Sequence, residues 1–238
     1  VNSSYIYCEV DSFSKPVIYP KLANTKTIIF RQKSQDSELN TNLLLGPTNN
    51  YSPKLSNLII ENAKIVKPSS YGIVRGIMSG IATVIFKDTE TISDVGGSNG
   101  YMCLVGESNY VSIYLPVLEF TNRGQLTYNN KSYLKYLYIG YKENSKSNPI
   151  YLANKANGLT DIELKDGFCK PLSVANTTTE LTEDNMVNHI LKRLKQDEPL
   201  CGEGVTITLG ETNLSRLTSD ESIALLDSLT NTYGYTFA

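Results

Sequence analysis

The chain has 238 residues and a formal net charge of −2, so its charge gives no reason to expect binding to DNA, RNA or an acidic membrane. It has no run of about 18 consecutive apolar residues, the length needed to cross a bilayer, so we expect no membrane insertion. The four cysteines form no C-x-x-C pair and have no zinc-site spacing, so no metal is predicted.

Short segments that end in apolar residues at alternate positions recur along the chain. Their central apolar residues are Ile6, Ile28, Leu58, Val84, Ile113, Leu137, Ile162 and Ile207. Six of the seven successive spacings lie between 22 and 30 residues, in or near the period of about 20–29 residues typical of leucine-rich repeats. Each segment is predicted to be a strand beside its neighbours, with the central residues aligned in a shared apolar core.

In chain order, strands are expected at residues 2–10, 25–31, 55–61, 82–88, 110–118, 134–140 and 159–165. The segments between them are rich in proline, glycine and polar residues and are expected to be irregular returns. Between residues 67 and 80, the spacing of apolar residues predicts a short helical turn. Cys8 takes an inward position of the first strand and is expected to be a small buried hydrophobic residue.

After residue 180 the pattern changes from strands to amphipathic helices. A helix is predicted over residues 182–195, with Thr182 as its N-cap. Its apolar stripe consists of Met186, Ile190, Leu191 and Leu194. This helical return explains the one long spacing of 45 residues, between Ile162 and Ile207, and a further strand is expected at 205–209.

A second helix is predicted over residues 218–232, where Thr218 and Glu221 have the spacing of a capping box. Its expected apolar face consists of Ile223, Leu225, Leu226 and Leu229. Asn213 is placed at a turn, where its side-chain amide can satisfy backbone groups. A short strand at 235–237 ends the chain, and the two helices are expected to cover the end of the stack.

The outward positions of the strands contain more apolar and aromatic residues than an exposed face usually does. The central outward row is predicted to be Tyr7, Ile29, Ile59, Ile85, Tyr114, Tyr138, Glu163 and Thr208, flanked by Tyr5, Glu9, Arg31, Lys87 and Tyr136. One interpretation is a binding surface with Tyr114, Tyr136 and Tyr138 as aromatic anchors, together with Ile85 and Glu163. The other is that the chain's own loops or another subunit bury this face.

No motif for catalysis or cofactor binding is found, so neither an enzyme nor a cofactor is predicted. The single histidine, His189, has no second histidine or nucleophile at a spacing that would suggest catalysis. The pairs Asp161 with Glu163 and Asp88 with Glu90 each share a strand face, which could serve acid–base chemistry or hold a cation. A solvated outer edge of the sheet explains them more simply.

The C-terminal residues 181–238 carry the most specific pattern. After the first helix they read V-T-I-T-L-G-E-T-N-L-S-R-L-T-S-D-E from Val205 to Glu221, and the chain closes with Y-G-Y-T-F-A. This segment resembles the C-terminal unit of bacteriophage tail and fibre proteins, and of related bacterial surface proteins, that contain irregular leucine-rich repeats. Their usual last aromatic residue is tryptophan, where this chain has Tyr235.

The repeat pattern and this resemblance together predict an α/β leucine-rich-repeat solenoid. Residues 1–180 would form irregular repeats, and 181–238 a helical C-terminal unit continuous with them. The resemblance implies a non-enzymatic virion protein of a tail or fibre, acting in host attachment or virion assembly. Its partners would be other virion proteins or copies of itself, and a host-surface receptor or glycan. The alternative is a secreted or cell-surface bacterial adhesin, whereas a glycan-cleaving enzyme would need paired carboxylates in a groove.

Overall fold

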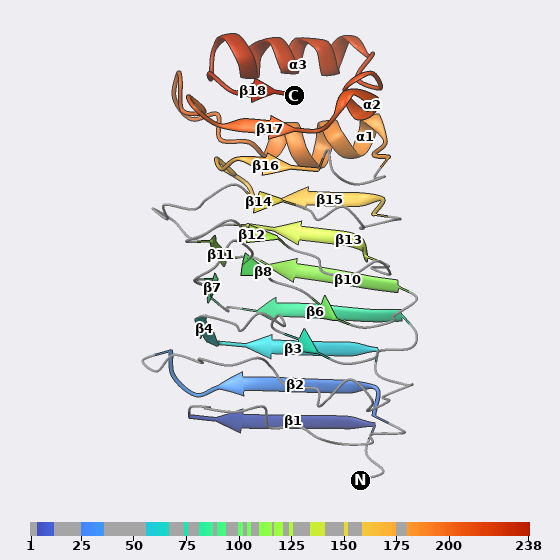
Figure 1. The fold of residues 1–238 in the computed structure, drawn as a ribbon, viewed down its shortest axis with the longest axis vertical. Coiled ribbons are helices and arrows are strands. Elements are labelled where there is room, and N and C mark those ends of the chain that lie inside the picture. Colours follow the sequence, from blue (N-terminus) through green and yellow to red (C-terminus); the bar gives the residue numbers. More distant parts are fainter. Residues whose placement is uncertain are drawn as a thin grey trace.

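Seven parallel strands form the principal sheet of the computed structural model, and their order in the sheet follows their order in the chain (Figure 1). They are β1 (Tyr5–Val10), β2 (Thr27–Gln32), β3 (Asn57–Glu61), β6 (Ile81–Lys87), β10 (Tyr110–Leu115), β13 (Leu134–Ile139) and β15 (Asp161–Leu164). The structure describes residues 4–11, 25–35, 56–66, 74–75, 81–87, 90–93, 100–101, 104–105, 110–115, 117–120, 124–125, 134–140, 150–151, 159–174 and 180–238.

The predicted register is confirmed for the first seven repeats. Their central residues, from Ile6 in β1 to Ile162 in β15, pair with one another from strand to strand without interruption. The prediction is wrong for Ile207, which lies in β17 (Thr206–Thr208) and pairs with Leu172 in another sheet. The long spacing before Ile207 contains a helical segment, and that segment occupies the position beside β15 where an eighth strand would lie.

The returns between these strands are more regular than expected. Six short strands form a second parallel sheet, in the order β18 (Thr236–Phe237), β17, β16 (Leu172–Ser173), β14 (Ile150–Tyr151), β12 (Gly124–Gln125) and β8 (Gly100–Tyr101). Three more form a sheet of β11 (Val117–Phe120), β7 (Glu90–Ser93) and β4 (Lys64–Val66). Because β17 and β18 join the same sheet as β16, the stack continues into the C-terminal unit.

Two local predictions are wrong. The helical turn expected between residues 67 and 80 is replaced at Val74–Arg75 by strand β5, which pairs with β9 (Leu104–Val105). Pairing with a distant segment thus overrides a short helical spacing, which is a weak signal on its own. The strand expected at 110–118 is two strands, β10 and β11, which end and begin on either side of Pro116, a residue with no backbone N–H to donate.

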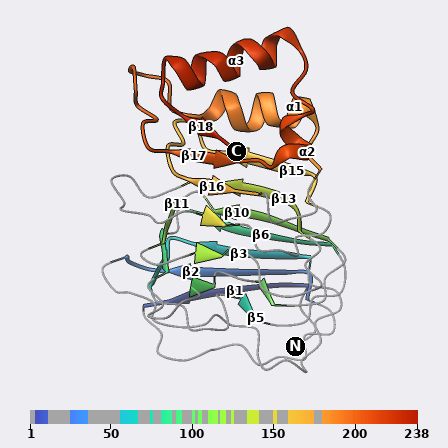
Figure 2. The same ribbon diagram turned by 45° about the horizontal axis from the view of Figure 1, so that its top comes forward.

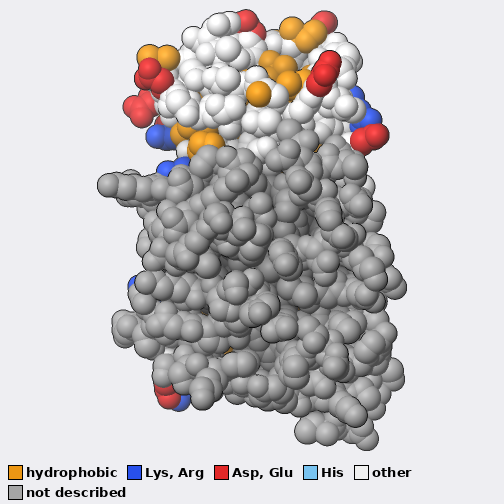
Figure 3. All heavy atoms as spheres, viewed as in Figure 1, with side chains coloured by type: hydrophobic (Ala, Val, Ile, Leu, Met, Phe, Trp, Pro, Cys, Tyr) orange, Lys and Arg blue, Asp and Glu red, His pale blue; other side chains and the backbone are white. Residues whose placement is uncertain are grey.

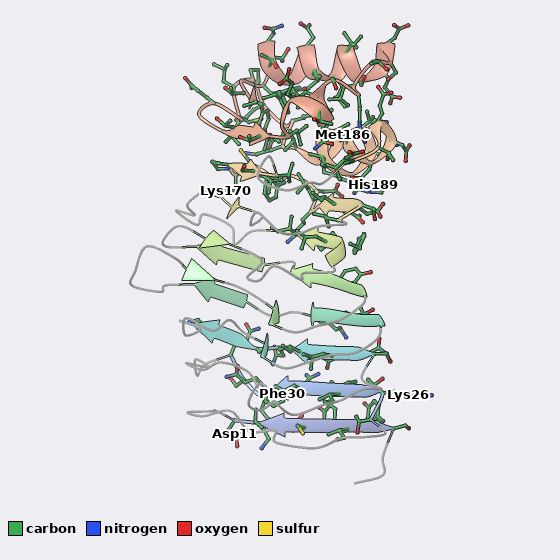
Figure 4. The ribbon with its side chains drawn as sticks, turned by 45° about the vertical axis from the view of Figure 1, so that its right-hand side comes forward. Asp11, Lys26, Phe30, Lys170, Met186 and His189 are labelled. Carbon is green, nitrogen blue, oxygen red and sulfur yellow. The ribbon has the colours of Figure 1, made fainter. Side chains whose placement is uncertain are left out.

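The apolar core lies behind the principal sheet. Inward apolar residues of β2, β3, β13 and β15 are at most 1% exposed; they are Ile28, Phe30, Leu58, Ile60, Leu137, Ile139, Ile162 and Leu164. Figure 4 labels Phe30, which lies on β2. Full burial of each such side chain contributes about 1.5–3 kcal/mol. Cys8 points to the same side but is half-buried, because β1 has a neighbouring strand on one side only within the described residues. It forms no disulfide, and neither do Cys169 and Cys201.

The first C-terminal helix is confirmed as one continuous helical segment, made of α1 (Glu183–Asn185), η1 (Met186–Ile190) and η2 (Leu191–Arg193). Thr182 is its N-cap as predicted, since its side chain accepts a hydrogen bond of 3.1 Å from the backbone N–H of Asn185. The predicted apolar stripe, which includes Met186 (Figure 4), is buried. No helix within the described ranges is both long enough and apolar enough to cross a membrane.

The second helix, α3 (Asp220–Asn231), follows the short α2 (Glu211–Leu214), and both it and the first helical segment lie at the C-terminal end of the stack (Figure 2). The predicted capping box is wrong, because Ser219 is the N-cap and accepts from Ser222 N at 3.2 Å. Glu221 instead forms an ion pair of 2.6 Å with Lys192.

The predicted apolar face of α3 is only partly correct. Leu229 is buried, but Ile223 is 54% exposed. Figure 3 shows that hydrophobic side chains reach the surface of this C-terminal unit among acidic ones. As the outermost layer, α3 has an underlying partner along one side only.

Asparagine side chains satisfy the backbone where strands give way to helices. Asn213 was predicted to do so, and it accepts from Leu181 N and donates to Leu209 O, both at 2.9 Å. Asn185 does the same for β15: its Oδ1 accepts from Ile162 N, and its Nδ2 donates to Ile162 O, both at 3.3 Å. The Asn185 amide therefore replaces the neighbouring strand that Ile162 lacks on this side.

We expect Asn185→Ala to lower the free energy of unfolding by about 2 kcal/mol, because it leaves the buried N–H and C=O of Ile162 without partners. Asn188→Ala on the same helical segment removes only exposed contacts to Asp184 and Lys192 and should cost about 0.5 kcal/mol or less. Urea unfolding of both variants tests this. Equal losses would show that the Asn185 amide is not needed to close the sheet edge.

Glu183 connects the first helical segment to the start of α3. Its Oε1 accepts from the backbone N–H groups of Thr218 and Ser219, both at 2.8 Å, and from Ser222 Oγ at 2.7 Å. Hydrogen bonds from Ser219 and Ser222 are the main cause that lowers the pKa of this carboxyl from 4.5 to about 2. The stabilisation is therefore complete above pH 4.5 and is lost as the pH falls towards 2.

Glu183→Gln should lower the melting temperature at pH 7, because the amide replaces a charged acceptor of three hydrogen bonds with a neutral one. The difference from wild type should shrink as the pH falls from 4.5 towards 2, where the wild-type carboxyl also becomes neutral. Thermal melts across this range, with Glu203→Gln at an exposed site as control, measure it. A difference that is constant with pH would rule out the charged acceptor as its source.

Candidate binding face

The outward side of the principal sheet carries the predicted central row. Its members pair in register from strand to strand and are Tyr7, Ile29, Ile59, Ile85, Tyr114, Tyr138 and Glu163. Thr208, predicted as the last member, is not part of it, since β17 lies in the second sheet beside Ser173. Tyr7 is 47% exposed, whereas the other six are half-buried.

Three tyrosines on β10 and β13 form what we call the tyrosine cluster: Tyr114, Tyr136 and Tyr138. The ring centroid of Tyr114 lies 5.2 Å from that of Tyr136 and 6.3 Å from that of Tyr138, with the planes tilted by 46° and 31°. These are ordinary distances for favourable aromatic pairs. Ile85 pairs with Tyr114 from the adjacent strand β6. The structure thus brings together four of the predicted binding residues.

Glu163 lies at the end of the tyrosine cluster and supplies its charge. Its Oε2 accepts a hydrogen bond of 2.6 Å from the hydroxyl of Tyr136, and its Oε1 lies 3.8 Å from Arg193 Nη2. Arg193 also donates from Nη1 to Asp166 Oδ1 at 2.6 Å. A carboxylate and a guanidinium therefore stand side by side next to the three rings.

The surroundings of Tyr136 and Tyr138 make these two phenols harder to ionise. Burial, followed by the hydrogen bond to Glu163 and its negative charge, raises the pKa of Tyr136 well above its ordinary value. Burial and the charges of Glu163 and Asp166 raise the pKa of Tyr138 in the same way. The hydrogen bond to Asp166 is the main cause that raises the pKa of Arg193. At neutral pH the phenols of Tyr136 and Tyr138 therefore stay protonated beside these charges, and that of Tyr136 donates to Glu163.

Arg193 and Asp166 were missed as site residues by sequence reasoning. Arg193 comes from η2 in the C-terminal unit and Asp166 from the residues that follow β15, so the site is completed by segments 27 residues apart in the chain. The sequence showed Arg193 only as a basic residue near a helix end. Nothing in the spacing to Glu163 indicates that the two side chains meet.

A second outward row carries charges of alternating sign. Glu9, Arg31, Glu61 and Lys87 pair in register on β1, β2, β3 and β6. Arg31 lies 3.9 Å from the carboxylate of Glu9 and 3.5 Å from that of Glu61, and Lys87 lies 3.9 Å from Glu61. We call these four residues the charge ladder. The Glu61 side chain is only 18% exposed, whereas those of Glu9, Arg31 and Lys87 are more than 40% exposed, so each pair is at least partly solvated and contributes little stability. Their order along the stack is regular.

The other residues considered for catalysis or metal binding are Asp161, His189, Asp88 and Glu90. Asp161 shares the outward face with Glu163 and accepts a hydrogen bond of 2.6 Å from Thr160. His189 lies on the helical segment (Figure 4), and its Nδ1 has no hydrogen-bond partner among the residues with described side chains. Across these residues, no group of three or more His, Cys, Asp or Glu side chains could hold a metal ion. Asp88 lies outside the described residues, as do the side-chain contacts of Glu90.

Comparisons of the chain with protein-family models, with curated proteins and with solved structures gave no significant match. The function must therefore be argued from the geometry of this face.

Glu163→Gln should bring the pKa of Tyr136 down, because it removes a charged acceptor and a negative charge while burial remains. Tyrosine ring carbons observed by NMR during an alkaline titration report it. Asp161→Asn serves as the control, because it neutralises a carboxylate that pairs in register with Tyr136 but accepts its hydrogen bond from Thr160. If both variants leave the Tyr136 titration unchanged, the Tyr136–Glu163 contact does not exist in solution.

Proposed function

We propose that this protein is a non-enzymatic attachment protein whose tyrosine cluster, with Glu163 and Arg193, binds a surface glycan or receptor. The observation that carries the proposal is that the rings of Tyr136 and Tyr138 lie 5.2 and 6.3 Å from that of Tyr114, beside a carboxylate–guanidinium pair. Aromatic faces bind the apolar faces of sugar rings, and charged groups at the rim accept and donate hydrogen bonds to hydroxyls. The same residue types serve as anchors at protein interfaces.

The rigid scaffold supports this assignment. The strands that carry the cluster have buried inward residues such as Leu137 and Ile139, which fix the backbone beneath it. Side chains that are already held in place lose less conformational entropy on binding. Tyr136 and Tyr138 fit this description, because each is half-buried and so partly held by its neighbours and partly accessible.

The biological setting that we propose rests on the sequence resemblance of residues 181–238. It is a leucine-rich-repeat protein of a bacteriophage tail or fibre, located in the virion, with other virion proteins or copies of itself as neighbours. Several copies in one particle would raise the effective concentration of weak binding sites. A secreted or cell-surface bacterial adhesin is the alternative, because the same segment resembles those proteins too, and it would use the same face.

The triple variant Tyr114→Ala, Tyr136→Ala, Tyr138→Ala should lose binding on a glycan array, since loss of an aromatic anchor at an interface typically costs 2 kcal/mol or more, roughly thirtyfold in affinity. The double variant Tyr5→Ala, Tyr7→Ala removes two rings, 50% and 47% exposed, from the far end of the same face and should bind like wild type.

Thermal melts of all three proteins verify that each is folded at the temperature of the array. Equal binding by the triple variant and wild type would remove the tyrosine cluster as the binding site. Loss of binding in the double variant alone would move the site to the other end of the sheet.

A further inference from the structure

The two ends of the principal sheet differ. At β15, the amide of Asn185 pairs with both backbone groups of Ile162 and closes the edge. At the other end, β1 pairs with β2 alone within the described part of the chain. An edge strand with available N–H and C=O groups is a template for another strand, and many proteins protect such edges.

The hydrogen bonds between β1 and β2 show which backbone groups of β1 face outwards. The carbonyl of Ser4 accepts from Lys26 N at 2.9 Å, and that of Val10 accepts from Lys33 N at 2.9 Å, so these groups point to β2. Backbone groups alternate along a strand with a period of two residues. The N–H and C=O of Tyr7 and Glu9 therefore point away from β2, towards the open edge.

The core is also incomplete at this end. On β2, the inward residues Ile28 and Phe30 are fully buried. Their partners on β1, Ile6 and Cys8, are only half-buried. The apolar rows thus end on side chains that a further strand would cover, and covering them is favourable at roughly 25 cal/mol per Å² of apolar area.

The charge ladder indicates which side chain a further strand would need beside Glu9. It runs Glu9, Arg31, Glu61, Lys87, so the next position beyond Glu9 calls for a basic residue. The segment Tyr5–Val10 contains no lysine or arginine. A second copy that paired its β1 with this edge would therefore bring no cation to the position beside Glu9.

We propose that the open edge of β1 is a docking site for an extended segment of a partner protein, which adds as a further parallel strand. The segment carries a lysine or arginine opposite Glu9, an aliphatic or aromatic residue opposite Tyr7, and apolar residues at the inward positions over Ile6 and Cys8. This is strand addition, in which backbone hydrogen bonds give affinity and alternate side chains give specificity. It does not depend on the tyrosine cluster.

The probe is a fluorescent peptide with the sequence of residues 25–33, TKTIIFRQK, because its own copy in β2 already pairs with β1 and sets Arg31 beside Glu9. Fluorescence anisotropy with the full chain should show binding. Exchanging the peptide's arginine for glutamate should weaken it roughly fivefold, the effect of an exposed ion pair. The Glu9→Lys protein should reverse this preference, whereas Glu203→Lys, an exposed control, should keep it.

Peptides methylated on one backbone nitrogen separate strand addition from simple charge attraction. In β2, the carbonyl of Lys26 accepts from β3, so the backbone groups of even-numbered residues face the next strand of the sheet. For a peptide of this sequence on the outer edge of β1, the next strand is β1 itself. Its even-numbered residues would therefore face β1. Methylation at the peptide's phenylalanine should therefore abolish binding, and methylation at the preceding isoleucine should not.

The proposal is overturned if the peptide does not bind, or if binding ignores both the charge exchange and the position of the methyl group. Sedimentation velocity provides the second measurement. A concentration-dependent dimer of the wild-type chain that is lost in Glu9→Lys would also overturn it, since the occupant of the edge would then be a second copy.

Discussion

The parallel backbone ladder of the principal sheet is the constraint on which the rest of the structure depends. Each strand forms backbone hydrogen bonds with the strands on either side of it, so an interior strand has partners for all its N–H and C=O groups. Only the two edge strands keep backbone groups without a strand partner. A stack of this kind gains stability with each added repeat, but it needs a separate solution at its ends. The residues that bind the unpaired backbone groups at the C-terminal end lie outside the repeated strand pattern. They belong to the helices of the C-terminal unit.

At the C-terminal end, buried side-chain amides replace a strand. Asn185 offers one acceptor and one donor to Ile162, the strand residue that has no sheet partner on this side. Asn213 does the same for Leu181 N and Leu209 O, which lie beside the helices. Glu183 then fixes α3 over this layer through three hydrogen bonds. The end is closed by specific polar contacts as well as by apolar packing, which leaves no strand position beside β15.

The same ladder makes the outward face a set of straight rows. The β10–β13 pairing shifts register between Val111 and Ser112, but the central row beyond that point stays aligned from β1 to β15. One residue type repeated in the sequence therefore becomes one stripe on the surface. This places Tyr114 and Tyr138 side by side although 24 residues separate them, and it orders the charge ladder. On β2, β3, β13 and β15 the outward side chains stand on strands whose inward residues are buried, which holds the backbone beneath them in place.

The sequence was sufficient to predict the register of the first seven strands, because the alternation around Ile28, Leu58 and Leu137 reflects one face of each strand in the core. It could not predict features that depend on contacts between distant segments. The strand at Val74–Arg75 exists through pairing with β9, and the N-cap of α3 is Ser219 because Glu183 occupies the neighbouring N–H groups. Arg193 reaches Glu163 only because the helical segment packs beside β15.

The alignment of successive strands is tested most directly by pulsed electron paramagnetic resonance on spin labels placed at Tyr7 and Glu163, with the native cysteines replaced. These positions lie in one row, six strand steps apart. At about 4.8 Å per step, the distance distribution should be narrow and centred near 29 Å, allowing for the label linkers. Labels at Tyr7 and Ile85, three steps apart, should give about half that value. A broad distribution, or distances that do not grow with the number of strands between the labels, would contradict a single in-register stack.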